Sequence, residues 1–98
     1  MPEHTFDPLL LSQARLGIVT ALVTRRDATF SDLKALLGMT QGNLGIHLQK
    51  LEEAGYVAVK KEFVHRRPRT TVRLTAKGRK AFMAHVEELG RIAREAGV

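Results

Sequence analysis

The stretch over residues 40–57 constrains the fold more strongly than any other part of the sequence. Thr40 can accept a hydrogen bond from the amides of a first helical turn, and Gly55 can adopt the left-handed conformation that ends a helix. Three leucines between them are spaced three and four apart and form one apolar stripe: Leu44, Leu48 and Leu51. We predict a helix over about residues 40–54 that packs through this stripe and leaves its other face free.

That free face has an unusual chemistry, because its first two turns hold small and amide residues and no charge. Gly42 and Gly45 each cost about 1 kcal/mol of helix propensity relative to alanine, so a requirement other than helix stability favours them. Close approach to another surface is one such requirement, and Gln41 and Asn43 carry the paired donor and acceptor that read adenine edges in a major groove. The alternative is that the glycines allow tight packing against a neighbouring helix.

A short junction joins this helix to the one before it. Ser31 is expected to cap a helix that runs to Leu37, and Gly38 is expected to end it. Only Met39 then separates Gly38 from Thr40. Two helices joined so closely must turn sharply against each other, which predicts a helix-turn-helix.

Another helix is predicted at the start of the chain. Asp7 can cap it, Pro8 suits its first position, and no breaker intervenes before about Val23. Leu9 and Leu10 add apolar surface beyond a single stripe. We therefore expect part of this helix to cover a partner chain.

After Gly55 the hydrophobic period changes from helical to two. Residues 56–64 and 70–74 are rich in β-branched and aromatic side chains, and residues 65–69 form a basic, proline-bearing turn between them. The pattern predicts a β-hairpin over about residues 56–75. A hairpin that directly follows a helix-turn-helix is a wing.

Charge is concentrated around this hairpin. The net charge is +6, yet the four cations and four acids of residues 1–49 cancel. Residues 60–80 hold nine cations against Glu62 alone, which is nine minus one, or +8: Lys60, Lys61, Arg66, Arg67, Arg69, Arg73, Lys77, Arg79 and Lys80. This excess lacks the interspersed acids of an ordinary solvated face and indicates a surface for a polyanion.

The last predicted helix begins after its cap Thr75 and runs from Ala76 to about Ala96. An apolar stripe continues along it for about four turns: Phe82, His85, Val86, Leu89, Ile92, Ala93 and Ala96. Three short helices and a hairpin cannot cover so long a stripe, so we predict that two copies of the chain pair through it, with Leu9 and Leu10 contributing. The alternative is that the helix folds back over its own domain.

Together these elements predict an α+β, mainly α fold: a winged helix-turn-helix with three N-terminal helices, a two-stranded β-hairpin wing and a long C-terminal helix. Ninety-eight residues suffice for one small domain. We expect a flexible lead over residues 1–6, a winged-helix unit over 7–75 and a dimerisation helix over 76–98.

The sequence also resembles a known family. The segments that carry the likeness are residues 41–57, Arg66-Arg67-Pro68-Arg69-Thr70, and residues 74–79. They are similar to the winged-helix transcriptional regulators of bacteria and archaea, nearest to small stand-alone proteins allied to the ArsR and MarR types. The likeness covers roughly residues 8–90 and is specific as an ensemble of motifs.

The resemblance implies which residues meet DNA. The groove-facing positions of the recognition helix would be Gln41, Gly42, Asn43, Gly45 and Ile46. Lys50 would lie near a phosphate, and Thr40 would act mainly as a cap, with its hydroxyl on a phosphate as a secondary use. Ile46 departs from the arginine or serine common in related regulators, although its side chain suits a thymine methyl. Three wing residues would reach a minor groove or the backbone beside it: Arg66, Arg67 and Arg69.

Other classes of protein fit poorly. The sequence has no cysteine, its histidines fall on four different predicted elements, and we expect no metal site and no cofactor. His47, beside the leucine stripe, is expected to be a border histidine of the core. No nucleophile, base and acid come together, so we predict no enzyme activity. No apolar run has the length of a signal peptide or a membrane span, so we expect a cytoplasmic protein without membrane contact.

The leading functional hypothesis is a sequence-selective regulator that binds double-stranded DNA as a homodimer. The alternative is a winged-helix module that binds another protein without reading DNA, and a third hypothesis is nonspecific compaction of nucleic acid. No residue pattern indicates a small-molecule effector, and the sequence leaves open whether one binds.

Overall fold

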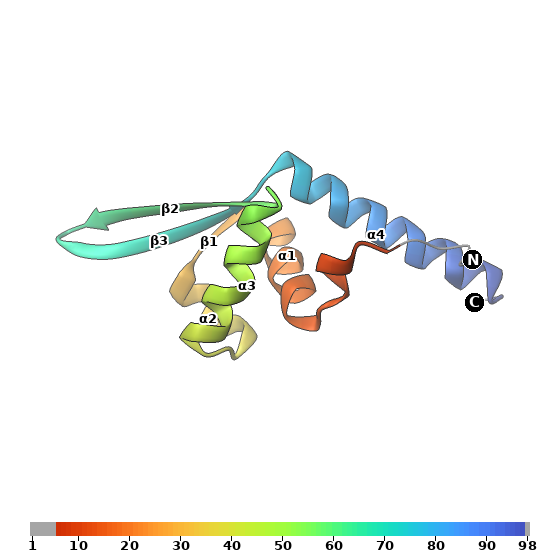
Figure 1. Ribbon diagram of the computed structural model, residues 1–98, viewed down its shortest axis with the longest axis horizontal. Coiled ribbons are helices and arrows are strands. Elements are labelled where there is room, and N and C mark those ends of the chain that lie inside the picture. Colours follow the sequence, from red (N-terminus) through yellow and green to blue (C-terminus); the bar gives the residue numbers. More distant parts are fainter. Residues whose placement is uncertain (1–5, 98) are drawn as a thin grey trace.

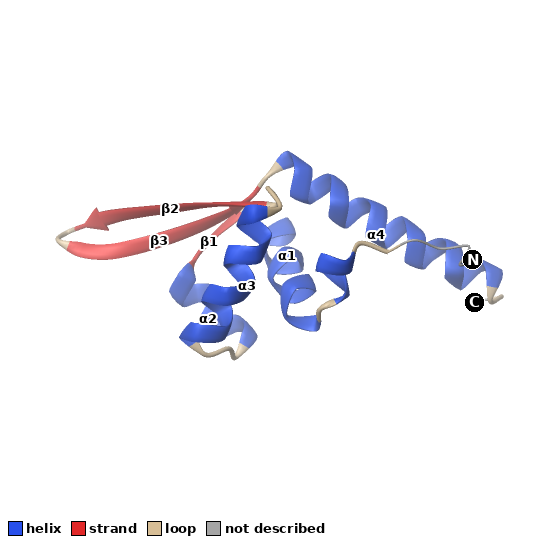
Figure 2. Ribbon diagram, viewed as in Figure 1, coloured by secondary structure: helices blue, strands red, loops and turns tan. Residues whose placement is uncertain are grey.

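The computed structural model describes residues 6–97. Its long axis is 55 Å and the other two are 25 and 23 Å, because the β-hairpin and the last helix project from opposite sides of a helical body (Figure 1). The elements in chain order are the 3-10 turn η1 (Pro8–Leu11), α1 (Gln13–Arg25), β1 (Asp27–Thr29), α2 (Phe30–Leu37), α3 (Gln41–Glu53), β2 (Val57–Val64), β3 (Arg67–Leu74) and α4 (Ala76–Glu95). The predicted α+β, mainly helical class is confirmed (Figure 2).

The helix-turn-helix forms where the junction predicts it. Gly38 has a φ of 62° and ends α2, and the hydroxyl of Thr40 accepts a hydrogen bond from the Asn43 amide at 3.2 Å. The leucine stripe of α3 packs with α1 and α2 in one core, in which the following side chains are at most 4% exposed: Ile18, Leu22, Leu33, Leu44, Leu48 and Leu51. The turn thus fixes α3 on the body through its apolar side.

Two predicted helix starts were wrong, for a shared reason. The backbone of Ser12 is extended and its hydroxyl accepts from the Arg15 amide at 3.3 Å, so α1 begins after Ser12 and the preceding residues form the separate turn η1. At α2 the cap is Thr29 rather than Ser31, because Thr29 and Asp32 exchange hydrogen bonds in a capping box. Several capping residues stand close together at both places.

The hairpin belongs to a three-stranded antiparallel sheet of order β1-β3-β2. β1 pairs only with residues 71–73 of β3, so Pro68 lies beyond it and its missing N–H breaks no ladder bond there. The predicted turn over residues 65–69 was too long. His65 and Arg66 alone make the turn, with φ values of 51° and 65°, as in the two-residue loops that match the twist of a hairpin.

A tight corner fixes the wing relative to α4. The hydroxyl of Thr75 donates to the carbonyl of Gly55 at 2.6 Å. A Cβ at Gly78 would lie 2.2 Å from the carbonyl oxygen of Tyr56, so only glycine lets α4 pass this close to the start of β2. The hydroxyl of Tyr56 also donates to the carboxylate of Asp7, which raises the pKa of Tyr56 to about 12 and joins the N-terminal side of the body to the base of the wing.

Part of the predicted dimer interface instead belongs to the protomer. Leu10 is 1% exposed and lies in the core, and Phe82 packs against that core. Each turns toward its own chain because η1 and the first turns of α4 lie on the helical body. Of the predicted lead, residues 1–5 lie outside the described residues, while the ring of Phe6 lies 5.5 Å from that of His85, which is buried.

Candidate nucleic-acid interface

The exposed face of α3 has the composition that the sequence indicates. Gln41, Gly42 and Asn43 are exposed, and Ile46 is 55% exposed. A Cβ at Gly42 or Gly45 would meet no atom within 4 Å. Packing against a neighbouring helix of the same protomer therefore does not explain these glycines. They keep the face slender and its backbone open to approach from outside.

The wing carries exposed cations along both strands, and three more lie at the start of α4. All nine lysines and arginines of residues 60–80 are exposed, and one of them, Lys60, forms an ion pair with Glu62 at 3.4 Å. Arg66 lies in the turn, whereas Arg67 and Arg69 lie on β3. Of the three residues predicted at the wing tip, Arg66 alone lies in the turn, and Arg67 and Arg69 follow it along β3 toward the base of the wing.

Register divides the wing into two faces. Residues paired directly across an antiparallel ladder share a face, and faces alternate along a strand. Val57 and Val59 face the core, so the same face continues outward through the pairs Lys61 with Thr70 and Phe63 with Pro68. The opposite face carries Lys60, Arg67, Arg69 and Arg73.

A groove of about 530 Å³ lies between α3 and the first of these faces. Its lining includes Gln41, Gly45 and Gln49 of α3 and Lys61 and Thr70 of the wing. Lys61 brings a positive charge to this lining and Glu52 a negative one, while the amides of Gln41 and Gln49 and the hydroxyl of Thr70 can donate hydrogen bonds to a sugar-phosphate strand. Gln49 and Thr70 were not predicted to contact DNA, and Lys61 was predicted only as part of the basic surface. Strand register places Lys61 and Thr70 here, and helical spacing places Gln49 beside Gly45.

A second hollow of about 360 Å³ borders the first. Gln41 lines both, and the second also includes Ser31, Pro68 and Arg69. The start of the recognition helix and residues 68–70 of β3 therefore border one continuous region. Arg66 and Arg67 lie farther out along the hairpin, which projects beyond the helical body (Figure 1).

His47 lies on α3 beside the buried leucine stripe, and its contact with Arg15 links α3 with α1 and η1. A guanidinium nitrogen of Arg15 lies 3.2 Å from Nδ1 of His47, and another nitrogen of Arg15 donates to the carbonyl of Leu9 at 2.8 Å. Burial lowers the pKa of His47, and the positive charges of Arg15 and Lys50 lower it further. A neutral imidazole can accept at Nδ1, so this contact favours the uncharged ring. Residues 6–97 contain no group of three or more side chains able to hold a metal ion.

We expect stability to fall at acidic pH in part through His47. The unfolded chain binds more protons than the fold below the ordinary histidine pKa of 6.5, so the contribution is complete above that pH and is lost as pH falls. Urea titrations at several pH values measure it. His47→Gln, which keeps an acceptor for Arg15, should weaken the pH dependence. An unchanged pH profile in His47→Gln would contradict this assignment.

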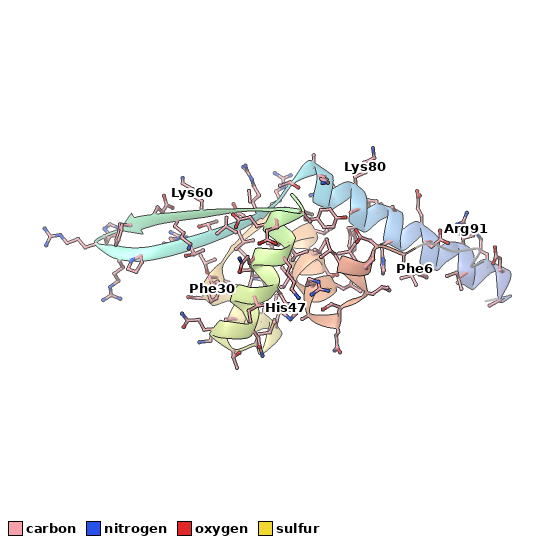
Figure 3. All side chains as sticks on the ribbon, viewed as in Figure 1. Phe6, Phe30, His47, Lys60, Lys80 and Arg91 are labelled. Carbon is pink, nitrogen blue, oxygen red and sulfur yellow. The ribbon has the colours of Figure 1, made fainter. Side chains whose placement is uncertain are left out.

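The outer part of α4 presents an apolar stripe. Met83, Val86 and Leu89 are 50%, 44% and 49% exposed. Lys80 and Arg91 are eleven residues apart, about three helical turns, and both point away from the side of α4 on which Phe6 lies (Figure 3). The first turns of α4 lie on the body, where Phe82 packs against the core, and the outer part of the helix projects away from it (Figure 1). None of the described helices is long and apolar enough to cross a bilayer.

Comparison with known proteins gives a consistent result. A family profile described as "Winged helix DNA-binding domain" matches residues 14–93. An uncharacterized protein of Methanocaldococcus jannaschii is 37% identical over 83 residues, which cover 85% of this chain and 90% of the relative. The recognition-helix and wing segments both lie within the matched range of the profile.

Solved structures agree with the fold. A transcriptional regulator homologue from Pyrococcus horikoshii OT3 is 33% identical, with a TM-score of 0.85 over 92% of this chain and 89% of that one. A mutant MarR from E. coli, solved in complex with operator DNA, is 21% identical, with a TM-score of 0.74 over 91% of this chain and 63% of its own. At 21% identity, the second likeness concerns the fold alone.

Proposed function

This chain belongs to the winged-helix DNA-binding domain family, and from that premise we propose that it is a sequence-selective transcriptional regulator that binds double-stranded DNA as a homodimer. The exposed face of α3 enters a major groove. The wing lies along the flanking backbone and the adjacent minor groove. Two copies, related by a twofold axis, read half-sites about 34 Å apart. We place this activity in the cytoplasm.

One observation carries the proposal most directly: a slender, uncharged helix face and a cationic hairpin border one groove. An α-helix fits the major groove only if its backbone can come close to the base edges, and open space at Gly42 and Gly45 allows that. The exposed amides of Gln41 and Asn43 then supply paired donors and acceptors for bases. The cations of the wing supply affinity through the phosphates.

Fluorescence anisotropy with genomic fragments tests the proposal. The wild-type chain should prefer some fragments over others, and its affinity should fall steeply between about 50 and 200 mM salt. Equal affinity for all fragments would support nonspecific compaction instead. A chain that binds no fragment but captures a protein from nuclease-treated extract would support the protein-interaction alternative.

A large side chain at Gly45 should raise the stability of the fold and lower the affinity for DNA. Gly45→Ala and Gly45→Leu should both raise the free energy of unfolding, by about 0.5–1 kcal/mol, because nothing opposes a Cβ there and both residues favour helix. Gly45→Leu should nevertheless weaken DNA binding about tenfold or more, because its side chain fills space that the duplex must enter. Urea denaturation and anisotropy measure the two effects.

Gly45→Ala serves as the matched control for size at that position. It should gain similar stability and keep most of the affinity. If Gly45→Leu binds DNA as well as the wild type, this part of α3 does not lie in the groove.

The homodimer is supported by the apolar stripe of α4. Val86 and Leu89 are about half exposed, and with Met83 they form a row of large apolar side chains on a helix that stands away from the body. Burying such a row against its symmetry mate would stabilise a dimer at about 25 cal/mol per Å² of apolar surface removed from water. Ile92, Ala93 and Ala96 extend the same stripe toward the end of the helix.

A further inference from the structure

Phe63 is the most exposed large apolar side chain of the described residues, at 77%. It is the penultimate residue of β2 and lies directly opposite Pro68 on β3. The pair therefore forms a small apolar surface near the tip of an otherwise cationic hairpin. The core of the protomer does not explain it, because that core ends nearer the base of the wing.

Strand register determines which face of the wing carries Phe63 and Pro68. Val59, Lys61 and Phe63 alternate along β2 on one side, and Val59 packs against the core while Lys61 lines the groove beside α3. Phe63 and Pro68 are thus the outward continuation of the face that borders the recognition helix. A duplex seated on α3 would meet this face of the wing.

The spacing suits the neighbouring groove of the duplex. Phe63 lies four positions beyond Val59 on β2, and at about 3.3 Å per residue this is about 13 Å along the strand. Half of the helical repeat of about 34 Å separates a major groove from the adjacent minor groove, or about 17 Å. Lys61 shares the face of the pair, Arg66 lies in the turn beyond it, and Arg67 and Arg69 lie on the other face of the same hairpin. The tip of the hairpin is therefore cationic, which suits the negative potential of that groove.

We propose that Phe63, backed by Pro68, is a wedge that enters the minor groove of the bound duplex and bends it. Phenylalanine and proline are among the residues that proteins insert between base steps from that groove, which partly unstacks the step and kinks the duplex. The inference rests on the proposed function. It adds a source of specificity that needs no hydrogen bond to a base, because pyrimidine–purine steps unstack most easily.

The test uses a duplex recovered by selection with the wild-type chain from a random pool, labelled at its ends with a donor and an acceptor dye. Binding of the wild type should shorten the distance between the ends. Phe63→Ala should lose most of that bend and bind about tenfold more weakly, as expected when one aromatic contact with bases is removed. Phe63→Leu should keep most of both effects. The recovered duplexes should carry a pyrimidine–purine step at the wing position, and the Phe63→Ala chain should no longer select it.

Val64→Ala is the matched control, because Val64 is the next residue and lies on the other face of the hairpin. It should change neither bend nor affinity. Equal bend and affinity in Phe63→Ala and wild type would overturn the wedge while leaving the proposed function intact. A lower melting temperature with an unchanged bend would also overturn it, since Phe63 would then only stabilise the hairpin. Failure of the wild type to bind any duplex would overturn the proposed function itself.

Discussion

Replacing Arg66, Arg67 and Arg69 together with glutamine should abolish most DNA binding while leaving the fold intact. All three side chains are exposed, so their loss removes no core contact. Each phosphate contact contributes a slope of about −0.9 to the dependence of log affinity on log salt, which is about eightfold in affinity at about 0.1 M salt. Three lost contacts on one wing should therefore lower affinity several hundredfold, and the salt slope should become shallower by about 2.7 per wing.

Anisotropy titrations at several salt concentrations measure both quantities. The control replaces Arg91 and Arg94 with glutamine, because these two cations lie at the outer end of α4, far from the wing. Arg91 points away from the body (Figure 3). If the control and the wing variant lose the same affinity per charge removed, net charge rather than the wing determines binding, and the placement of the duplex on the wing is wrong.

Leu89→Glu should separate the proposed dimer into folded monomers. Leu89 is 49% exposed in the protomer, so a carboxylate there is solvated in the monomer. In the paired helices it would be an unpaired buried charge, which costs several kcal/mol and should raise the dissociation constant about 100-fold or more. A monomer engages one half-site alone, so binding to a full operator should weaken by a similar factor.

Sedimentation velocity and circular dichroism check the two parts of this expectation. The wild type should sediment with twice the mass of one chain, and Leu89→Glu with the mass of one chain and unchanged helix content. Ala84→Glu is the control, because Ala84 is exposed and five residues away, which places it across the helix from Leu89. If the Leu89→Glu chain remains a dimer, the interface lies elsewhere.

Several features of the fold could be predicted because they depend on neighbours in sequence. Thr40 and Thr75 cap their helices as expected, and Gly38 adopts the left-handed conformation. Capping joins groups two or three residues apart, so the sequence contains most of the interaction. The leucine stripe of α3 was equally clear, because helical spacing alone determines which residues share a face.

Other features depended on choices between similar local candidates. Ser12 and Thr29 became caps where Asp7 and Ser31 were predicted to begin the main helices. Each candidate can accept the same amide hydrogen bond, so local chemistry hardly separates them. Packing of η1 and β1 against the rest of the chain makes the difference. The short turn at His65 and Arg66 follows in the same way from the pairing of β2 with β3.

The sequence by itself determined the helix-turn-helix, the wing, the uncharged face of α3 and the excess of positive charge, because all of these are written in short-range spacing and composition. Only the tertiary structure decided that Gly42 and Gly45 face open space, that Leu10 belongs to the core of its own protomer, and that Lys61 and Phe63 lie on the face of the wing beside α3. Each of these depends on strand register or on which side of an element meets the body. Such contacts join residues far apart in the chain, so a local sequence pattern cannot predict them.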